Sequence, residues 1–144
     1  MKTNKLRVQR GFTLLEILLV VVIIGMLVSV AVVKLSGQSQ RAKLVATQRQ
    51  IDAYKTALGV YELDNGLFPT TEQGLQALIT QPSGGGSLPN WKGPYLDPPV
   101  LRPDPWGHNY IYRNPGQKIP NGYDLFSPGP NGIEGDEDDI GNWQ

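Results

Sequence analysis

The chain has 144 residues, of which 40% are hydrophobic and 18% charged, a composition typical of a folded domain rather than a disordered segment. It contains no cysteine, which excludes a disulfide framework. Its 13 Lys and Arg balance its 13 Asp and Glu, and no basic surface points to a nucleic-acid partner. The charges are nevertheless separated along the chain. Lys2, Lys5, Arg7 and Arg10 lie at the start, and the acidic group Glu134, Asp136, Glu137, Asp138 and Asp139 lies near the end.

The first predicted element is a long apolar helix. No charged residue occurs from Ile17 to Val33. A helix over Phe12 to Val33 would extend about 33 Å, enough to cross a bilayer core of about 30 Å. The basic residues before it would stay on the cytoplasmic side, and everything after it would be exported. The sequence therefore predicts a single-pass protein with an exported C-terminal body.

Glu16 lies near the start of this apolar segment, where an ionised carboxylate costs about 2.5–3.5 kcal/mol on insertion scales. A secretory signal cut after Ala31 and a plain membrane anchor both agree with the apolar run, but neither explains Glu16. Cleavage between Gly11 and Phe12 would explain it, because the new α-amine of Phe12 would lie one helical turn from Glu16. The amine could neutralise the carboxylate within one molecule or between neighbours.

The segment "RGFTLLEILLVVVIIGML" resembles the N-terminus of type IV pilins and pseudopilins. The resemblance implies that residues 1–11 are a leader removed by a prepilin peptidase. The enzyme would cut between Gly11 and Phe12 and methylate the Phe12 amine. Glu16 matches the glutamate that the family uses in assembly, and residues 12–34 would form the transmembrane and assembly helix.

A periplasmic globular domain is expected over residues 35–144. A polar helix continues the apolar one and is expected to bury one face against a sheet. That face consists of Leu44, Ile51, Tyr54, Leu58 and Tyr61. Gly66 and Pro69 are expected to end this helix. The segment "TTEQGLQALITQP" predicts a short helix, with a capping box of Thr70 and Gln73 and buried Leu75, Leu78 and Ile79. Strands are predicted at residues 108–113 and 122–127. The fold class is α+β, a long helix on a small antiparallel sheet.

Three further segments narrow the resemblance. "YELDNGLFPTTEQGLQAL", "DPWGHNYIY" and "YDLFSPGPNGIEGDEDDIGNW" are similar to the major pseudopilins of type II secretion systems. The resemblance implies a type IV pilin-like fold with a calcium-bound C-terminal loop. It also implies a subunit that polymerises into the periplasmic pseudopilus and supports export of folded proteins. The implied partners are further copies of the chain, minor pseudopilins, the prepilin peptidase, the inner-membrane assembly platform with its ATPase, the outer-membrane secretin, and membrane lipid before assembly.

The acidic C-terminal segment is a candidate cation site. Its carboxylates, amides and glycines are what a loop needs to present six to eight oxygens to Ca²⁺. The EF-hand template does not fit, because its third ligand position falls on Ile140. A solvated acidic tail is the alternative that composition leaves open. The apolar residues Ile140 and Trp143 favour a segment that packs down.

The resemblance implies a specific set of calcium ligands: the side chains of Ser127, Asn131, Asp138 and Asp139, and the backbone carbonyls of Leu125 and Glu134. Asn131 stands where the family commonly has aspartate, so the site would have one formal charge fewer. We expect calcium to take the place of a disulfide by binding only the folded loop.

No catalytic motif is found, and the chain is predicted not to be an enzyme. His108, the only histidine, is expected in a turn or at a strand edge, and no cysteine nucleophile exists. Two alternatives to a secretion pseudopilin remain on sequence grounds. One is a type IV pilin or a DNA-uptake pseudopilin that forms a surface fibre. The other is a membrane-anchored calcium-binding module, which would need neither cleavage nor polymerisation.

Overall fold

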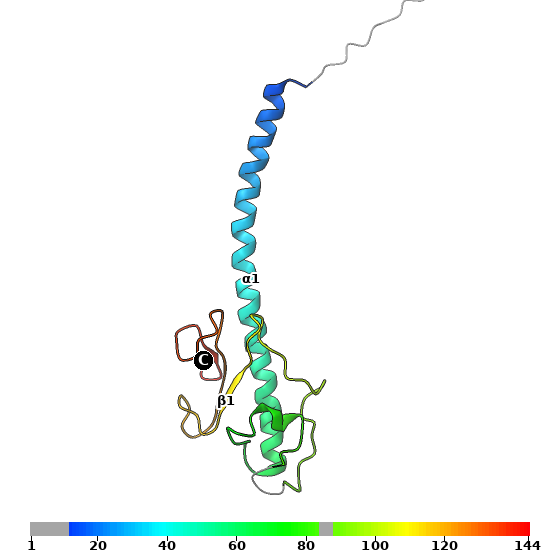
Figure 1. Ribbon diagram of the computed structural model, residues 1–144, viewed down its shortest axis with the longest axis vertical. Coiled ribbons are helices and arrows are strands. Elements are labelled where there is room, and N and C mark those ends of the chain that lie inside the picture. Colours follow the sequence, from blue (N-terminus) through cyan, green and yellow to red (C-terminus); the bar gives the residue numbers. More distant parts are fainter. Residues whose placement is uncertain (1–11, 84–87) are drawn as a thin grey trace, which may run out of the picture. The chain divides into compact units, whose positions relative to one another are not determined.

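The computed structural model describes residues 12–83 and 88–144, without the side chains of residues 29–36. The chain divides into two units, Met1–Gln40 and Arg41–Gln144. Its helices are α1 (Leu14–Asn65) and the 3₁₀ helix η1 (Leu75–Leu78), and its strands are β1 (Ile111–Arg113), β2 (Asp124–Ser127) and β3 (Ile140–Gly141). Figure 1 labels α1 and β1. Helix and antiparallel sheet confirm the predicted α+β class. The predicted leader, including Gly11, lies outside the described residues.

Helix α1 begins at Leu14, two residues later than predicted, because Thr13 caps it. The Glu16 amide donates to Thr13 Oγ1 over 3.2 Å, and the Ile17 amide donates to the Thr13 carbonyl over 3.2 Å. This is the N-cap arrangement in which a threonine oxygen satisfies an unpaired amide of the first turn. Glu16 lies in that first turn, where the helix dipole favours a carboxylate. Glu16 therefore also stabilises the N-terminus of α1 locally.

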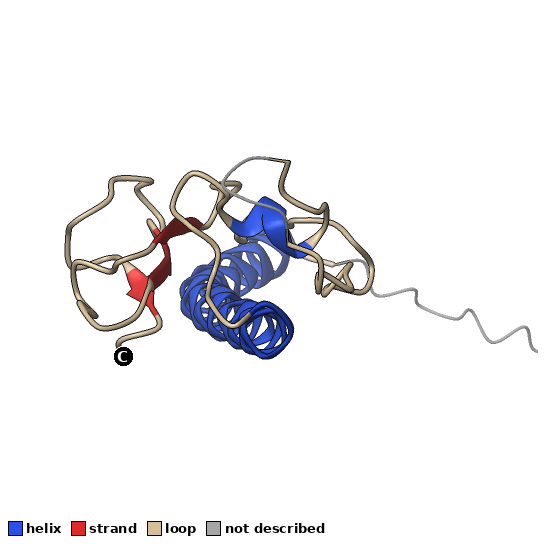
Figure 2. Ribbon diagram, turned by 90° about the horizontal axis from the view of Figure 1, so that it is seen from below, coloured by secondary structure: helices blue, strands red, loops and turns tan. Residues whose placement is uncertain are grey.

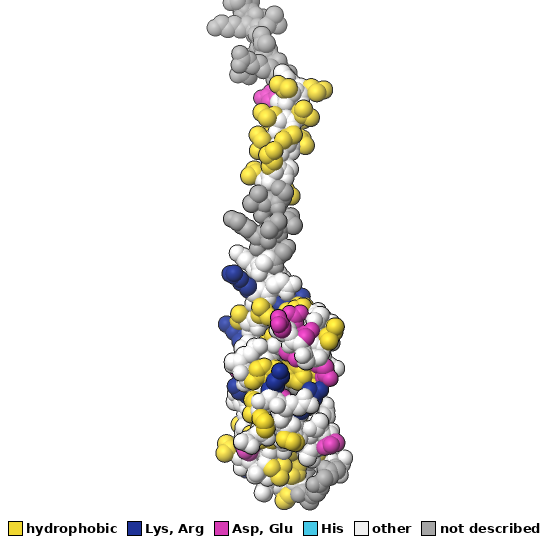
Figure 3. All heavy atoms as spheres, turned by 90° about the vertical axis from the view of Figure 1, so that its left-hand side faces the viewer, with side chains coloured by type: hydrophobic (Ala, Val, Ile, Leu, Met, Phe, Trp, Pro, Cys, Tyr) yellow, Lys and Arg dark blue, Asp and Glu magenta, His cyan; other side chains and the backbone are white. Residues whose placement is uncertain are grey.

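The described part of α1 in the first unit carries exposed apolar side chains. From Leu14 to Val28 the large apolar side chains range from 46% exposed at Val20 to 86% exposed at Leu14. Figure 3 shows them covering this segment of the helix. Among the described residues, no helix combines the length and the hydropathy of a membrane span.

The second unit is built on one face of α1. Ile51, Tyr54, Leu58 and Tyr61 are 0% exposed, which confirms four of the five predicted core positions. The fifth prediction is wrong, because Leu44 is 44% exposed. The buried stripe begins one turn later at Thr47, which is 0% exposed and whose hydroxyl donates to the Lys43 carbonyl over 2.9 Å. The buried stripe thus begins with a threonine whose hydroxyl has a hydrogen-bond acceptor within the helix.

The connection after α1 follows the predicted turn chemistry. Gly66 has φ +77° and its amide donates to the Glu62 carbonyl over 2.7 Å, as a left-handed C-cap requires. The capping box is reciprocal: the Thr70 amide donates to Gln73 Oε1, and the Gln73 amide donates to Thr70 Oγ1. The helix that follows is one short 3₁₀ turn, in which Leu75 and Leu78 are buried. Ile79, also predicted as buried, is half-buried.

The sheet has the order β1-β2-β3 and is antiparallel throughout. The two predicted strands are confirmed within shorter bounds, with Ile111 opposite Phe126 and Arg113 opposite Asp124. The third strand was missed, since it has only two residues and follows an acidic, glycine-containing run. Figure 2 shows how much of the second unit consists of loops around α1 and these short strands.

The loop between β1 and β2 is held by Asp124, a residue that is 1% exposed. One carboxylate oxygen accepts from the amides of Gln117 at 2.6 Å and Lys118 at 2.8 Å, and the other accepts from Ile119 at 3.0 Å. Three backbone donors converging on one buried carboxylate satisfy its charge without a cation. Asp124 is therefore the organising residue of this loop.

We expect Asp124→Asn to lower the free energy of unfolding by about 1–3 kcal/mol, because an amide –NH₂ would face backbone amides that need an acceptor. Denaturant titration of the detergent-solubilised chain measures this. A loss below about 0.5 kcal/mol would show that the loop does not depend on the carboxylate charge.

Burial raises the pKa of five tyrosine hydroxyls, those of Tyr54, Tyr61, Tyr110, Tyr112 and Tyr123. The folded state therefore keeps protons that the unfolded state loses above its tyrosine pKa of about 10. Stability is fully present below that pH and falls as pH rises above it. We expect denaturation midpoints to decrease from pH 9 to pH 11. Tyrosinate absorbance that titrates with a midpoint near 10 while the circular dichroism stays native would contradict this.

Candidate functional site

The acidic loop, residues 128–139, joins β2 to β3, and the pairing of these strands brings its two ends together. Ser127 lies opposite Ile140 in the sheet. Gly129 lies so close to the other end that an added Cβ would overlap the Asp138 carbonyl, and its φ of +68° also disfavours a side chain. The loop is therefore closed at its base, and it is not a free tail. Its outer part, residues 130–138, is exposed.

Asp139 has one carboxylate oxygen without a partner. The residue is 6% exposed, and its Oδ2 accepts from the Gly135 amide over 2.8 Å. Its Oδ1 is buried and makes no hydrogen bond. An unpaired oxygen of a buried carboxylate is costly, and a bound cation would satisfy it. This is the clearest sign that the predicted donor set suits a cation.

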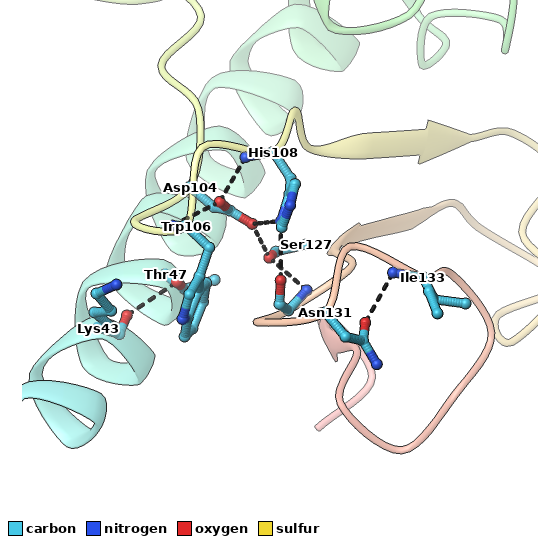
Figure 4. Close-up of polar contacts among 9 residues, drawn as sticks. Lys43, Thr47, Asp104, Trp106, His108, Ser127, Asn131 and Ile133 are labelled. Carbon is cyan, nitrogen blue, oxygen red and sulfur yellow. Dashed lines mark hydrogen bonds and ion pairs between the residues drawn. The ribbon is translucent and has the colours of Figure 1, made fainter. Parts of the chain in front are cut away.

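Asn131 joins two carboxylates of the loop. Its Nδ2 donates to Asp136 Oδ2 over 2.7 Å and to Asp138 Oδ2 over 3.2 Å. Its Oδ1 accepts from the Ile133 amide over 2.8 Å, as Figure 4 shows. The amide group therefore reduces the repulsion between Asp136 and Asp138. Its Oδ1 has a second lone pair, so the bond from the Ile133 amide does not prevent it from facing a cation.

The remaining predicted ligands have partners of their own. Ser127, which is 0% exposed, donates its hydroxyl to Asp104 Oδ2 over 2.5 Å and accepts from the Gly129 amide over 3.1 Å. The Leu125 carbonyl accepts from the Asn142 amide over 3.0 Å. Glu134 is predicted to bind through its backbone carbonyl, and its carboxylate instead pairs with Arg113 Nη2 at 2.8 Å, which ties the loop to β1. A carbonyl or hydroxyl oxygen has two lone pairs, so one accepted hydrogen bond still allows it to face a cation.

In the described part of the chain, no three His, Asp or Glu side chains are grouped as a metal cluster. A cation in this loop would therefore rely on Asp138, Asp139 and neutral oxygens. That donor set suits a hard cation such as Ca²⁺, which accepts carbonyl, amide and hydroxyl oxygens beside carboxylates.

Three residues that support the loop were missed at the sequence level. Asp104 is 4% exposed and bonds Ser127, and His108 Nδ1 lies 2.9 Å from the Gly129 carbonyl. Asn142 ties the end of the chain to β2. Its Oδ1 accepts from the Leu125 amide and its Nδ2 donates to the Tyr123 carbonyl. The only available signal was the D-P-W-G motif, which predicts a turn but not its partner.

The N-terminal processing residues are only partly described. Phe12 is 77% exposed at the start of the described residues, and Gly11 lies outside them. Glu16 is exposed on the first turn of α1. Phe12 and Glu16 are four residues apart, but Phe12 precedes the first helical residue, so the structure does not place them on one helical face.

Two family models match the chain in adjacent segments. A model described as "Prokaryotic N-terminal methylation motif" matches residues 6–32, and one described as "Type II secretion system (T2SS), protein G" matches residues 34–143. Together they cover the apolar segment and the globular unit.

Curated relatives match over nearly the whole length of the chain. "Type II secretion system core protein G" of Klebsiella pneumoniae is 46% identical over 136 residues, which is 94% of each chain. The protein of the same name from Vibrio cholerae is 44% identical over 143 residues, covering 97% of this chain and 95% of that one.

A solved structure agrees with the fold. The crystal structure of the major pseudopilin from the type 2 secretion system of enterohaemorrhagic Escherichia coli is similar, with a TM-score of 0.66 and 41% sequence identity. The match covers 76% of this chain and 93% of that chain. The chain belongs to the protein G family of type II secretion systems, the major pseudopilins.

Proposed function

We propose that the chain is a structural subunit that polymerises into the periplasmic pseudopilus of a type II secretion system and so supports the export of folded proteins. The observation that carries the proposal is an exposed apolar helix joined to a folded body, in a member of the protein G family. Apolar side chains that are 46–86% exposed need a lipid or helix partner in place of water. Lipid would cover them before assembly, and neighbouring subunits would cover them in the filament.

The N-terminal methylation motif supports processing by a prepilin peptidase. The enzyme would cleave between Gly11 and Phe12, remove residues 1–11 and methylate the new amine. Residues 12–34 would then span the inner membrane once, with residues 35–144 in the periplasm. Recruitment into the filament would involve the inner-membrane assembly platform and its ATPase, the minor pseudopilins and the outer-membrane secretin.

Glu16 would align an incoming subunit by pairing with the Phe12 amine of a neighbour. The carboxylate lies exposed on the first turn of α1, and the cut at Gly11 creates an amine four residues before it. In an apolar surrounding, opposite charges attract strongly, and each removes the cost of burying the other unpaired. The filament contact would be head-to-tail, so that it extends instead of closing into a ring.

We expect Glu16→Ala to be inserted and cleaved normally but to form few pseudopili. Intact mass should show the loss of residues 1–11 and the gain of one methyl group, and electron microscopy of sheared filaments measures assembly. Thr13→Ala is the matched control, because it removes the helix cap and leaves the Glu16 charge. Equal assembly defects in the two variants would assign Glu16 to stabilising the first turn of α1 alone, and normal assembly of Glu16→Ala would refute the pairing.

No catalytic role is proposed, although Asp104, His108 and Ser127 lie together in Figure 4. The Ser127 hydroxyl donates to Asp104, and His108 Nδ1 faces the Gly129 carbonyl. In a serine–histidine–aspartate triad the serine hydroxyl donates to a histidine nitrogen, which takes its proton. The hydrogen bonds here serve to hold loops in place, which agrees with a structural family.

The acidic loop would bind one Ca²⁺ through Asp138, Asp139, Ser127, Asn131 and the carbonyls of Leu125 and Glu134. The partnerless Asp139 Oδ1 supports this. The ion would supply positive charge between adjacent carboxylates, and it would link β2, the loop and β3. In a chain without cysteine, it would act as the cross-link that keeps the C-terminal segment ordered.

Calcium is expected to raise the melting temperature relative to chelator, and Asp139→Asn to abolish that rise. The substitution removes the unpaired charge while keeping an oxygen that accepts from the Gly135 amide. Glu137→Gln is the matched control, since Glu137 is an exposed loop carboxylate outside the ligand set. Scanning calorimetry with and without calcium gives the result. Identical melting temperatures for the unmodified chain in both conditions would refute the calcium site.

A further inference from the structure

We propose that Asp104 is a positioning residue for the cation site: it orients the Ser127 hydroxyl so that an oxygen lone pair is available to the ion. The inference rests on the proposed calcium site and extends it to a turn more than twenty residues away in the sequence. No residue of that turn belongs to the ligand set.

The hydrogen bonds of Ser127 leave one of its oxygen lone pairs free for a cation. A serine hydroxyl has one donor and two acceptor lone pairs. The donor points to Asp104 Oδ2 at 2.5 Å, and the Gly129 amide occupies one lone pair at 3.1 Å. One lone pair remains. A hydroxyl that coordinates a cation must direct its hydrogen away from the ion, and here a buried carboxylate accepts that hydrogen.

Asp104 is itself fixed. Its Oδ1 accepts from the amides of Trp106 at 3.0 Å and His108 at 2.8 Å. Its own amide donates to the His108 carbonyl over 2.8 Å, which closes the turn. The side chain of Asp104 is 0% exposed, so water does not compete for Oδ2. The carboxylate therefore cannot turn away from Ser127 without breaking the turn.

The same turn contacts the loop at two more places. His108 Nδ1 lies 2.9 Å from the Gly129 carbonyl, and an added Cβ on Gly132 would lie 2.7 Å from His108 Nε2. His108 thus contacts the loop at Gly129 and at Gly132, which flank Asn131 in the sequence. These contacts hold the backbone of the loop, whereas only Asp104 sets the direction of the Ser127 hydroxyl (Figure 4).

Asp104→Asn separates these roles. The asparagine oxygen can still accept from the Trp106 and His108 amides, so the turn is kept. Its –NH₂ then faces Ser127 as a donor, and the hydroxyl has to reverse. The hydroxyl hydrogen would point into the space that the cation needs. The substitution is therefore expected to weaken the cation site specifically.

The experiment is calcium titration of the mature, detergent-solubilised chain by isothermal calorimetry. We expect Asp104→Asn to weaken calcium binding about tenfold, the lower end of the effect of losing a group that orients a metal ligand. Ser127→Ala should weaken it by a similar factor. The variant that carries both substitutions should bind calcium no more weakly than the single variant with the lower affinity, because Asp104 acts through Ser127.

Asp124→Asn is the matched control. It too removes a buried carboxylate that organises a loop, but its three amide partners lie in residues 117–119. It should lower the melting temperature and leave the calcium affinity within about twofold, because its carboxylate has no contact with the proposed ligands. If Asp104→Asn is unfolded without calcium, the calcium concentration that refolds it gives the affinity by linkage.

Three results would overturn the proposal. The first is an unchanged affinity in Asp104→Asn. The second is a double variant in which the two losses multiply. The third is an equal loss in Asp124→Asn, which would make the effect one of general stability. Absence of calcium binding by the unmodified chain would instead refute the calcium site, and the role of Asp104 with it.

Discussion

Buried carboxylates that accept backbone and hydroxyl hydrogens hold together the loop-rich body of this pseudopilin. Among the described residues, three aspartates are buried: Asp104, Asp124 and Asp139. Asp124 binds the loop between β1 and β2, and Asp104 binds its own turn and Ser127. Asp139 binds the Gly135 amide inside the acidic loop. Without cysteine, this chain uses charge-assisted hydrogen bonds where small exported domains often use disulfides.

These three carboxylates differ in one respect that bears on function. Both oxygens of Asp104 and of Asp124 have hydrogen-bond donors, whereas Oδ1 of Asp139 has none. A carboxylate whose two oxygens both accept hydrogen bonds needs no cation. A half-bonded one is suited to a cation, and it lies in the loop whose ends are joined by β2 and β3. Asn131 modifies this balance, because its –NH₂ already bridges Asp136 and Asp138. These hydrogen bonds lower the repulsion between the two carboxylates and leave their charge unchanged.

Much of the fold could be predicted from the sequence because it depends on local signals. The stripe from Ile51 to Tyr61, the Gly66 cap and the capping box of Thr70 and Gln73 follow from helical spacing and hydrogen-bond rules. The prediction that Leu44 is buried was wrong, because helical periodicity gives the buried face of α1 but not the residue at which the globular unit begins to cover it. β3 was not predicted because a strand of two residues is too short to show an alternation of apolar and polar side chains. The link from Asp104 to Ser127 could not be foreseen, since it joins two loops that only the folded sheet brings together.

Hydrogen exchange measured by mass spectrometry, with calcium and with chelator, tests most directly whether a cation completes the acidic loop. If a cation completes the loop, calcium slows exchange in residues 127–141 of the mature chain. No change is expected at residues 117–119, where Asp124 already supplies every acceptor. Exchange that is the same in both conditions, or that slows equally in both segments, would contradict the account.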